Sequence, residues 1–534
     1  MVPTRRQAQD STRSTTVGPV VVGVGPVSFA DVVAVARDEA SVRIGDDALD
    51  ALARARTVVE ELAAAVTPAY GISTGFGALA TRHIPTEKRA QLQKSLVRSH
   101  AAGSGPEVER EVVRALMLLR LSTLATGHTG VRPATAALMA AFLSHGITPV
   151  VHEYGSLGCS GDLAPLAHCA LALMGEGSVR DATGTLVPAA EAIAAAGLEP
   201  VELVAKEGLA LINGTDGMLG MLVLALDDLG RLLRTADIAA AMSVEGQLAT
   251  DRVFAPELQA IRPHPGQALS AANLTAVLEG SGVVASHRGP DCNRVQDAYS
   301  LRCSPQVHGA ARDTLEHCAT VAARELASAI DNPVVLTDPI SGVSRVESNG
   351  NFHGAPVAYV LDFAAIVAAD VASISERRTD RFLDKARSHG LPPFLAFDPG
   401  VDSGHMIAQY TQAAIVSEMK RLAAPASVDS IPSSAMQEDH VSMGWSAARK
   451  LRRSVDGLTR VIAIEVLTAA RALDMRRPLE PSAATGAVVA LLRASGVEGP
   501  GPDRHLSPEI ETAVELVRTG AVLHAVEEVI GELQ

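Results

Sequence analysis

The chain has 534 residues, of which 47% are hydrophobic and only 3% aromatic, and it carries a formal net charge of −14. This composition, rich in Ala, Val and Leu, favours closely packed helices and is a poor match to an all-β barrel. The excess of acidic residues, with no run of Lys or Arg, argues against nucleic acid or an anionic membrane as a partner. We therefore expect the partners to be small solutes or other subunits.

The cysteines and the N-terminal residues bear on the cellular compartment in which the protein is expected. The five cysteines are odd in number and form no CxxC pair, so we expect neither a disulfide framework nor a metal site. Residues 1–18 are polar and lack the apolar core of a signal peptide, and no transmembrane segment is predicted. These features indicate a cytoplasmic protein that binds no membrane.

The first part of the chain alternates helical patterns with glycine-rich loops. Residues 1–26 are expected to form a disordered tail. Ser28 and Asp31 form an S-x-x-D start signal for a helix that runs to about Arg37. Further helices are expected at about 47–66, 86–102 and 107–125. Glycine-rich loops are expected at 68–77 and 155–161. Asp162 is expected to cap the helix that follows the second loop.

Beyond residue 216 the sequence changes to long segments rich in Ala, Leu and Val. Their apolar residues recur at three- and four-residue spacing, which is typical of helices packed in a bundle. These segments lie at about 216–247, 306–330, 356–384, 404–423 and 440–475. Ser507 followed by Pro508 predicts a late helix with Ser507 as its cap. We predict a mainly α protein with an N-terminal domain (27–215), a central bundle of long helices (216–475) and a small C-terminal helical segment (476–534).

The tripeptide Cys159-Ser160-Gly161, in the second glycine-rich loop, permits an unusual reaction. Because Gly161 has no Cβ, its amide nitrogen can approach the carbonyl carbon of Cys159. Attack there with loss of water closes a five-membered ring, and a second dehydration removes the hydroxyl of Ser160. The product, a methylidene-imidazolone, is an electrophile that no ordinary side chain supplies. Taken alone, Ser-Gly-Asp is more often a simple turn followed by a helix cap.

The residues around the tripeptide change that balance. Gly155-Ser-Leu-Gly-Cys-Ser-Gly-Asp-Leu-Ala-Pro-Leu-Ala-His168 resembles the signature of the methylidene-imidazolone enzymes, which comprise the histidine, phenylalanine and tyrosine ammonia-lyases and related aminomutases. The resemblance continues in the same order through Tyr70–Gly77, Ser99–Gly103, Lys206–Thr215, Val295–Arg302, Gly350–His353 and Gln437–Met443. Within this family, Ser99-His100 combined with Gln437-Glu-Asp-His440 is most similar to the histidine ammonia-lyases.

The chain departs from the family pattern at four positions. Cys159 stands where Ala is usual, Ala298 stands where Pro is usual, and Asp216 and Met436 stand where Gln and Asn are common. None of these changes removes an expected catalytic group. Ring closure uses only the backbone carbonyl of Cys159, so we expect its thiol to be a spectator whose sulfur could still alter sensitivity to oxidants.

The resemblance implies catalytic and anchoring roles for four residues outside the loop. Tyr70 is expected to act as the base at the substrate Cβ, and Tyr299 is the second phenol, assigned to the electrophile and to proton handling. Arg302 offers a planar fork that matches the substrate carboxylate. Asn213 is expected to hold the imidazolone oxygen and the substrate through its amide.

The remaining implied residues contact the substrate or its ring. Gln296 and Gln437 are expected to be polar contacts, and Phe352 is expected to pack beside the ring. His100 is expected to reach the distal part of the substrate side chain. Glu418 is expected to accept a hydrogen bond from the substrate imidazole.

Each assignment also has a simpler structural interpretation. Tyr70 on its own is typical of packing, and Arg302 of a structural ion pair. Asn213 sits where a helix C-terminal cap is common, and His100 is spaced as a core or capping histidine. Glu418 has a possible partner in Arg421, three residues further along the helix.

The resemblance implies a homotetramer that eliminates ammonia from L-histidine to give trans-urocanate. It implies a 4-methylidene-imidazol-5-one formed from Cys159-Ser160-Gly161, with no diffusible cofactor. Phe352-His353-Gly354 and Gln409-Tyr-Thr-Gln412 are also similar to the tyrosine and phenylalanine enzymes, so a lyase or aminomutase acting on those substrates is the nearest alternative. A non-catalytic helical scaffold is the alternative of a different class.

Overall fold

A computed structural model describes residues 18–65, 71–75, 84–289, 292, 295–338 and 340–534. The chain divides into two compact units, and each unit draws on three stretches of sequence. The first unit takes Met1–Leu224, Val321–Ala358 and Ala426–Ser446; the second takes Ala225–Thr320, Tyr359–Pro425 and Ala447–Gln534. The fold is mainly α, which confirms the prediction from composition and periodicity.

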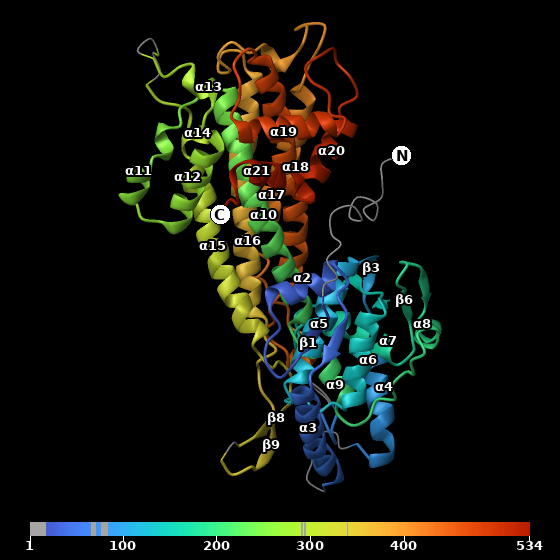
Figure 1. Cartoon of the computed structure of the whole chain (residues 1–534). Coiled ribbons are helices and arrows are strands. Elements are labelled where there is room, and N and C mark those ends of the chain that lie inside the picture. The colour runs from blue at the N-terminus through green and yellow to red at the C-terminus, as the bar shows by residue number, and fades with distance from the viewer. Residues whose placement is uncertain (1–17, 66–70, 76–83, 290–291, 293–294, 339) are drawn as a thin grey trace. The chain divides into compact units, whose positions relative to one another are not determined.

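The first unit surrounds a helical core with short paired strands (Figure 1). Its helices are α2 (Phe29–Arg37), α3 (Asp46–Ala64), η2 (Thr86–Lys88), α4 (Arg89–His100), α5 (Arg110–Ala125), α6 (Pro133–Ser144), α7 (Leu163–Leu173), α8 (Ala189–Ala195), α9 (Glu207–Ile212) and η5 (Ser434–Met436). Its strands are β1 (Val20–Val22), β2 (Val42–Ile44), β3 (Ser104–Glu107), β4 (Thr148–Pro149), β5 (His152–Tyr154), β6 (Ser178–Arg180), β7 (Leu186–Pro188), β8 (Val334–Thr337) and β9 (Ser344–Glu347). They pair as β1–β2 in parallel, and as β3–β5, β4–β6–β7 and β8–β9 in antiparallel fashion.

The N-terminal start signal is confirmed. The Ser28 hydroxyl accepts a hydrogen bond from the Asp31 amide at 3.1 Å, and the Asp31 carboxylate accepts one from the Ser28 amide at 2.9 Å. This reciprocal pair satisfies two backbone donors at the start of α2. Strand β1 lies inside the segment expected as a tail, whereas residues 1–17 lie outside the described residues.

Two of the expected helix caps are corrected. Asp162 does occupy the N-cap position of α7, but its side chain makes no capping hydrogen bond. Its two carboxylate oxygens are already engaged, by the hydroxyl of Ser156 and by the amide of Met218. In helix α20 (Ser507–Arg518) the N-cap is Leu506 and Ser507 is the first helical residue, so the helix begins one residue earlier than expected.

The second unit is built on long helices (Figure 1). Among the described residues, four helices contribute residues to both units, namely α10 (Asp216–Gly246), α15 (Ser304–Leu326), α16 (Ala355–Leu383) and α18 (Gly444–Met475). The remaining elements are η3 (Arg252–Phe254), α11 (Pro256–Ala260), α12 (Pro265–Leu278), α13 (Gly282–Ala285), α14 (Tyr299–Arg302), η4 (Pro393–Leu395), α17 (Met406–Leu422), α19 (Ala483–Ala494), α20 and α21 (Ala521–Ile530). The long helices confirm the apolar periodicity to within a few residues at each end.

A buried carboxylate joins three of these helices within the second unit. Glu465 of α18 pairs with Arg378 of α16 at 2.9 Å, and both side chains are fully buried. Its oxygens also accept hydrogen bonds from Ser243 of α10 at 2.7 Å and from Ser375 of α16 at 2.6 Å. Because every oxygen has a partner, this burial of charge is tolerated in an otherwise apolar bundle.

One helix meets the length and composition of a membrane span. Among the described residues this is α16, whose most apolar window has a mean hydropathy of 1.9. Within the structure 61% of that window is buried, as in the core helix of a bundle.

Candidate active site

The electrophile loop, residues 155–161, is a tight turn with left-handed backbone at its centre. The φ angles of Gly158, Ser160 and Gly161 are +81°, +50° and +83°. A Cβ on Gly161 would overlap the carbonyl oxygen of Gly214, so no other residue fits there without displacing backbone. The Gly214 amide donates to the Ser160 carbonyl at 3.1 Å, and the Gly214 carbonyl accepts from the Asp162 amide at 2.8 Å.

These residues fit a self-made imidazolone. Gly161 offers a backbone nitrogen without a side chain beside it, as ring closure requires. Ser160 already occupies a left-handed conformation that L-residues rarely adopt, and its carbonyl is fixed by Gly214. The loop is therefore held bent by the segment that joins α9 to α10, rather than being a simple entry to a helix.

Asp162 ties this loop to the start of α10. The Met218 amide donates to Asp162 Oδ2 at 2.9 Å, and the Ser156 hydroxyl donates to Oδ1 at 3.0 Å. Burial is the main cause that raises the pKa of this carboxyl to about 7, opposed by the two hydrogen bonds and reinforced by Asp216. Asp162 consequently positions the loop, a role beyond the helix cap that its place in the sequence predicts.

Asn213 adopts the C-cap position of α9 with extended backbone. Its Nδ2 donates to the carbonyl of Leu209 at 3.0 Å, and its own carbonyl accepts from Arg120. The structural interpretation of Asn213 as a cap is thus realised, and its contact with a ring or substrate stays a prediction. The pair of Arg120 with Asp216, at 3.3 Å, was not expected from the sequence.

A buried ion pair lies in the same unit. Lys206 and Asp331 are fully buried and their Nζ and Oδ2 atoms are 2.5 Å apart. Burial lowers the pKa of Lys206, and the charge of Asp331 opposes that shift. Lys206 opens one of the segments that carry the resemblance, but nothing in its immediate sequence indicates a partner 125 residues away.

The thiol of Cys159 has a polar partner far along the chain. Cys159 Sγ lies 2.9 Å from Ser433 Oγ, and Ser433 Oγ donates to Glu438 Oε2 at 2.7 Å. Burial raises the pKa of the Cys159 thiol, and the Ser433 hydrogen bond partly opposes this. Val441 and Met443 pack against Cys159. Sequence reasoning missed Ser433 and Glu438, although Glu438 directly follows Gln437 in a segment that carries the resemblance.

The other predicted residues of the first unit lie at partly exposed positions. Phe352 is half-buried and Gln437 is exposed. Next to them, His353 Nε2 and His440 Nδ1 are 3.2 Å apart and the two rings stack with centroids 5.3 Å apart. His100 is the last residue of α4, where its Nδ1 lies 2.8 Å from the carbonyl of Leu96. Tyr70 lies outside the described residues.

In the second unit, α14 carries two predicted residues in contact. The guanidinium carbon of Arg302 lies 4.6 Å from the centroid of the Tyr299 ring, a cation–π arrangement. Tyr299 is 71% exposed, and Gln296 just before it is also exposed. Arg302 Nε is buried and has no hydrogen-bond partner in the described part of the chain. A donor without a partner beside an exposed phenol is suited to an anionic ligand.

Arg378 links α14 to the bundle core. Besides its pair with Glu465, its Nη1 donates to the carbonyl of Ser300 and to the hydroxyl of Ser304, both at 3.3 Å. Ser300 stands between Tyr299 and Arg302 in the same helix. The side chains of α14 are therefore carried by a backbone that the buried ion pair fixes.

Glu418, on α17, has a partner that the sequence did not indicate. It forms an ion pair with Arg453 of α18, and the two side chains are 43% and 63% exposed. Within the described residues, the carboxylate of Glu418 pairs with Arg453 on the adjacent helix and not with Arg421. Its contact with an imidazole stays a prediction.

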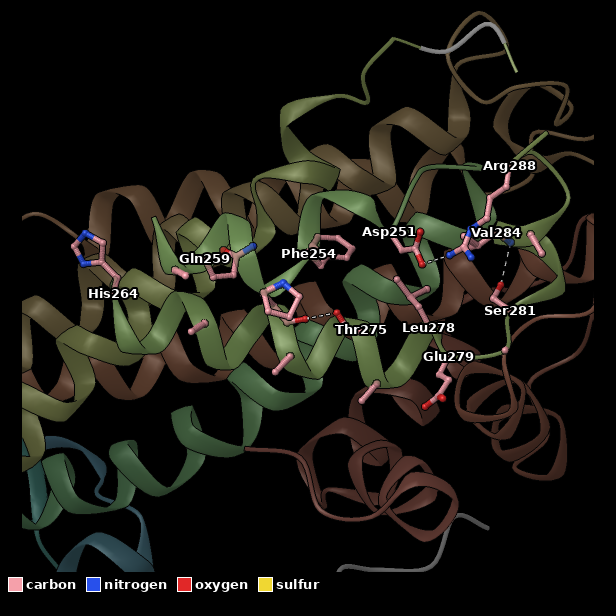
Figure 2. Close-up of a pocket in the computed structure, with 18 of the residues that line it drawn as sticks. Asp251, Phe254, Gln259, His264, Thr275, Leu278, Glu279, Ser281, Val284 and Arg288 are labelled. Atoms are coloured by element: carbon pink, nitrogen blue, oxygen red, sulfur yellow. Dashed lines mark hydrogen bonds and ion pairs between the residues drawn. The ribbon is translucent and has the colours of Figure 1, made fainter. Parts of the chain in front are cut away.

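A large apolar pocket lies elsewhere in the second unit (Figure 2). Its volume is about 1110 Å³, and α11, α12 and α13 supply most of its lining. Asp251 and Arg288 form an ion pair at one end, and Thr275 and Leu278 of α12 face into it (Figure 2). None of the predicted site residues lines this pocket, so size alone does not identify the place of catalysis.

Comparison with known proteins identifies the family. The family described as aromatic amino acid lyase matches residues 27–494. Histidine ammonia-lyase from Streptomyces griseus is 67% identical over 96% of this chain and 99% of its own length. Histidine ammonia-lyase from Streptomyces coelicolor is 66% identical over the same shares.

Solved structures agree in fold. Tyrosine aminomutase from Streptomyces globisporus superposes with a TM-score of 0.90 at 37% identity, over 97% of this chain and 100% of that one. Histidine ammonia-lyase from Trypanosoma cruzi superposes with a TM-score of 0.86 at 37% identity, over 96% and 95%. The chain therefore belongs to the aromatic amino acid lyase family and is a carbon–nitrogen lyase.

Proposed function

We propose that this chain is a histidine ammonia-lyase, which eliminates ammonia from L-histidine to give trans-urocanate in the first step of histidine degradation. The observation that carries the proposal is the 67% identity to a histidine ammonia-lyase over nearly the full length of both chains. The bend of the loop at Ser160 supports the ring closure on which the proposed reaction would depend.

The proposed prosthetic group is a 4-methylidene-imidazol-5-one made by the chain from Cys159-Ser160-Gly161, and no diffusible cofactor or metal enters the proposal. Such a group would supply an electrophilic carbon for the amino group of the substrate. Gly214 holds the backbone of Ser160 and of Asp162 on either side of Gly161, so the loop keeps its bend during closure. The free amides at the start of α7 would be suited to stabilising negative charge on the ring oxygen.

The second unit is proposed to bind the amino acid head of the substrate. Arg302 would hold the carboxylate through its planar fork, and Tyr299 would handle a proton, with Gln296 as a further polar contact. Stacking on the Tyr299 ring fixes the plane of the guanidinium, which lowers the entropy lost on binding. Tyr70 is proposed as the base at the substrate Cβ.

The first unit is proposed to supply the remaining contacts. Asn213 would hold the ring oxygen and the substrate, Phe352 would pack beside the ring, and Gln437 would be a polar contact. These three residues follow from the resemblance. Their common unit also carries the electrophile loop.

The imidazole of the substrate is proposed to meet His100 and Glu418. The Leu96 carbonyl can only accept, so the Nδ1 atom of His100 must carry the hydrogen in their 2.8 Å contact. In the neutral ring this leaves Nε2 as an acceptor, which matches an imidazole N–H. For Glu418 to accept such a bond, its pair with Arg453 must open or be shared.

We propose that the chain works as a homotetramer in the cytoplasm. Tyr359, Phe363 and Ile366 are exposed on α16 at spacings of four and three residues, and Ile407 and Tyr410 are exposed on α17. An apolar stripe of this kind is suited to burial against another subunit. All five cysteines are free, which agrees with a reducing compartment.

A panel of amino acids tests the substrate. Purified protein should release ammonia from histidine with formation of urocanate, and should act on tyrosine and phenylalanine at least about tenfold more weakly, since their rings lack the matching polar edge. The likeness to tyrosine aminomutase makes tyrosine the alternative substrate. Preference for tyrosine, or conversion to a β-amino acid, would overturn the histidine assignment.

A further inference from the structure

A strained turn follows the exposed residues near position 431. Ser433 and Glu438 pair with each other, because the Ser433 amide donates to the Glu438 carbonyl at 2.9 Å and the Glu438 amide donates back at 3.3 Å. Between them Ser434, Ala435 and Met436 have φ angles of +49°, +53° and +68°. Three consecutive non-glycine residues in the left-handed region persist only where the surroundings hold them.

The hydroxyl of Ser433 is one of the groups that hold this turn, and its hydrogen bonds have a direction. The carboxylate of Glu438 accepts, so the single hydroxyl hydrogen of Ser433 is given to Oε2 at 2.7 Å. The thiol of Cys159, 2.9 Å away, must then be the donor to Ser433 Oγ. Burial raises the pKa of this thiol, so it keeps its hydrogen at neutral pH. The chain of donors therefore runs from Cys159 through Ser433 to Glu438.

The surroundings strengthen this link. Leu157, Leu163, Val441 and Met443 pack around Cys159, which keeps water from competing for its thiol. The backbone approaches closely as well, since a Cβ on Gly158 would lie 3.0 Å from the Met443 amide nitrogen. The segment from 433 to 443 therefore contacts the electrophile loop at both of its ends.

We propose that Ser433 is a positioning residue. Its hydroxyl accepts a hydrogen bond from the Cys159 thiol and donates one to Glu438. These two bonds hold the turn that carries Gln437 and Glu438 against the electrophile loop. The inference rests on the proposed function of that loop. It revises the expectation that the thiol is a spectator. Cys159 supplies its carbonyl to the ring and its side chain to the alignment of the neighbouring turn.

Loss of either hydrogen-bonding group should loosen the turn without unfolding the unit. Ser433→Ala should lower kcat/KM for histidine about threefold to tenfold, the range expected for one hydrogen bond. Cys159→Ala should have a similar effect and still form the ring. Both changes break the same series of hydrogen bonds. The double variant should therefore have a kcat/KM no lower than that of the less active single variant.

The test combines kinetics with intact mass and thermal unfolding of the full-length protein. Ser433→Thr keeps the hydroxyl and Cys159→Ser keeps a donor, so both should recover most of the lost kcat/KM. Ser430→Ala is the matched control, because the Ser430 hydroxyl accepts a hydrogen bond from the Val441 amide at 2.9 Å in the same segment and belongs to a different hydrogen bond from the Cys159–Ser433–Glu438 series. The control should keep native kinetics.

The possible outcomes separate the two proposals. A native chain whose mass shows no loss of two waters would refute the proposed prosthetic group. If the native chain has cyclised, but Ser433→Ala matches Ser430→Ala, or the single effects multiply in the double variant, the positioning role of Ser433 is wrong. If Ser433→Ala does not fold, the kcat/KM of Cys159→Ala compared with that of Cys159→Ser tests the same series of hydrogen bonds at its thiol end.

Discussion

The candidate residues of the two units differ in how far contacts within the unit fix them. In the first unit, Ser160 and its neighbours are tied by Gly214, Asp162 and the Cys159–Ser433 contact, all within one chain. In the second unit, Tyr299 is 71% exposed and Glu418 pairs with an arginine that is itself mostly exposed. The difference teaches that the loop proposed to form the electrophile is fixed by packing within its own unit, whereas Tyr299 and Glu418, proposed to contact the substrate, are exposed to a ligand or to another subunit.

The strongest way to break this comparison is to remove the hydroxyl that the ring needs. Ser160→Ala should reduce urocanate formation more than about a thousandfold, because alanine cannot dehydrate to the methylidene carbon. Thermal unfolding should change little, since the methyl fills nearly the same space. Intact mass should show that no water is lost. Substantial turnover by this variant would show that the reaction does not use an electrophile formed from Ser160.

A smaller effect on activity is expected from the exposed residues of the second unit. Arg302→Ala should lower kcat/KM about tenfold to a hundredfold, mainly through KM, because a charge-assisted hydrogen bond to the carboxylate is lost. Arg302→Lys should recover only part of the lost kcat/KM, because a lysine ammonium does not reproduce the two parallel hydrogen bonds of a guanidinium. Steady-state kinetics with histidine measure both. Unchanged KM in Arg302→Ala would exclude the carboxylate role.

Glu418 sharpens the comparison because its ion pair and its proposed ligand compete. Glu418→Gln should lower kcat/KM for histidine about tenfold, whereas Arg453→Gln should leave it unchanged or raise it. Both should alter the free energy of unfolding by less than about 1 kcal/mol, as for other exposed pairs. Glu511→Gln, which breaks the exposed pair with Arg460, is the control. Equal kinetics for all three variants would reduce Glu418 to an ion-pair partner.

The last prediction concerns the pH dependence of stability in the first unit, with no effect on substrate binding invoked. Asp162 has its pKa raised from 3.8 to about 7 in the folded protein, mainly by burial. Between these values the folded state binds more protons than the unfolded state, so this group's contribution to stability falls as pH rises through that window. Asp162→Asn does not titrate, so its Tm minus the native Tm should increase from about pH 4 to about pH 7. A flat difference would show that Asp162 titrates normally.

The sequence predicted local structure better than long-range partners. Helix α2, the long helices and the bend at Gly161 follow from caps, apolar spacing and a missing Cβ, all of which act over a few residues. The partners of Lys206 and Cys159 lie 125 and 274 residues away and leave no local signal. The same holds for Arg453, which displaced the nearer Arg421 as the partner of Glu418 because the adjacent helix presents it.

The Cys159–Ser433 contact also has a consequence for synthesis on the ribosome. Ser433 emerges 274 residues after Cys159, and the partner of Lys206 emerges 125 residues after that lysine. At roughly 5–20 residues per second, the electrophile loop waits roughly 14–55 s for Ser433. For part of that interval Lys206 lacks its ion-pair partner Asp331, and throughout it the Cys159 thiol lacks its acceptor. Ring closure that depends on the finished packing would accordingly be a late event, completed after the second half of the polypeptide has been made.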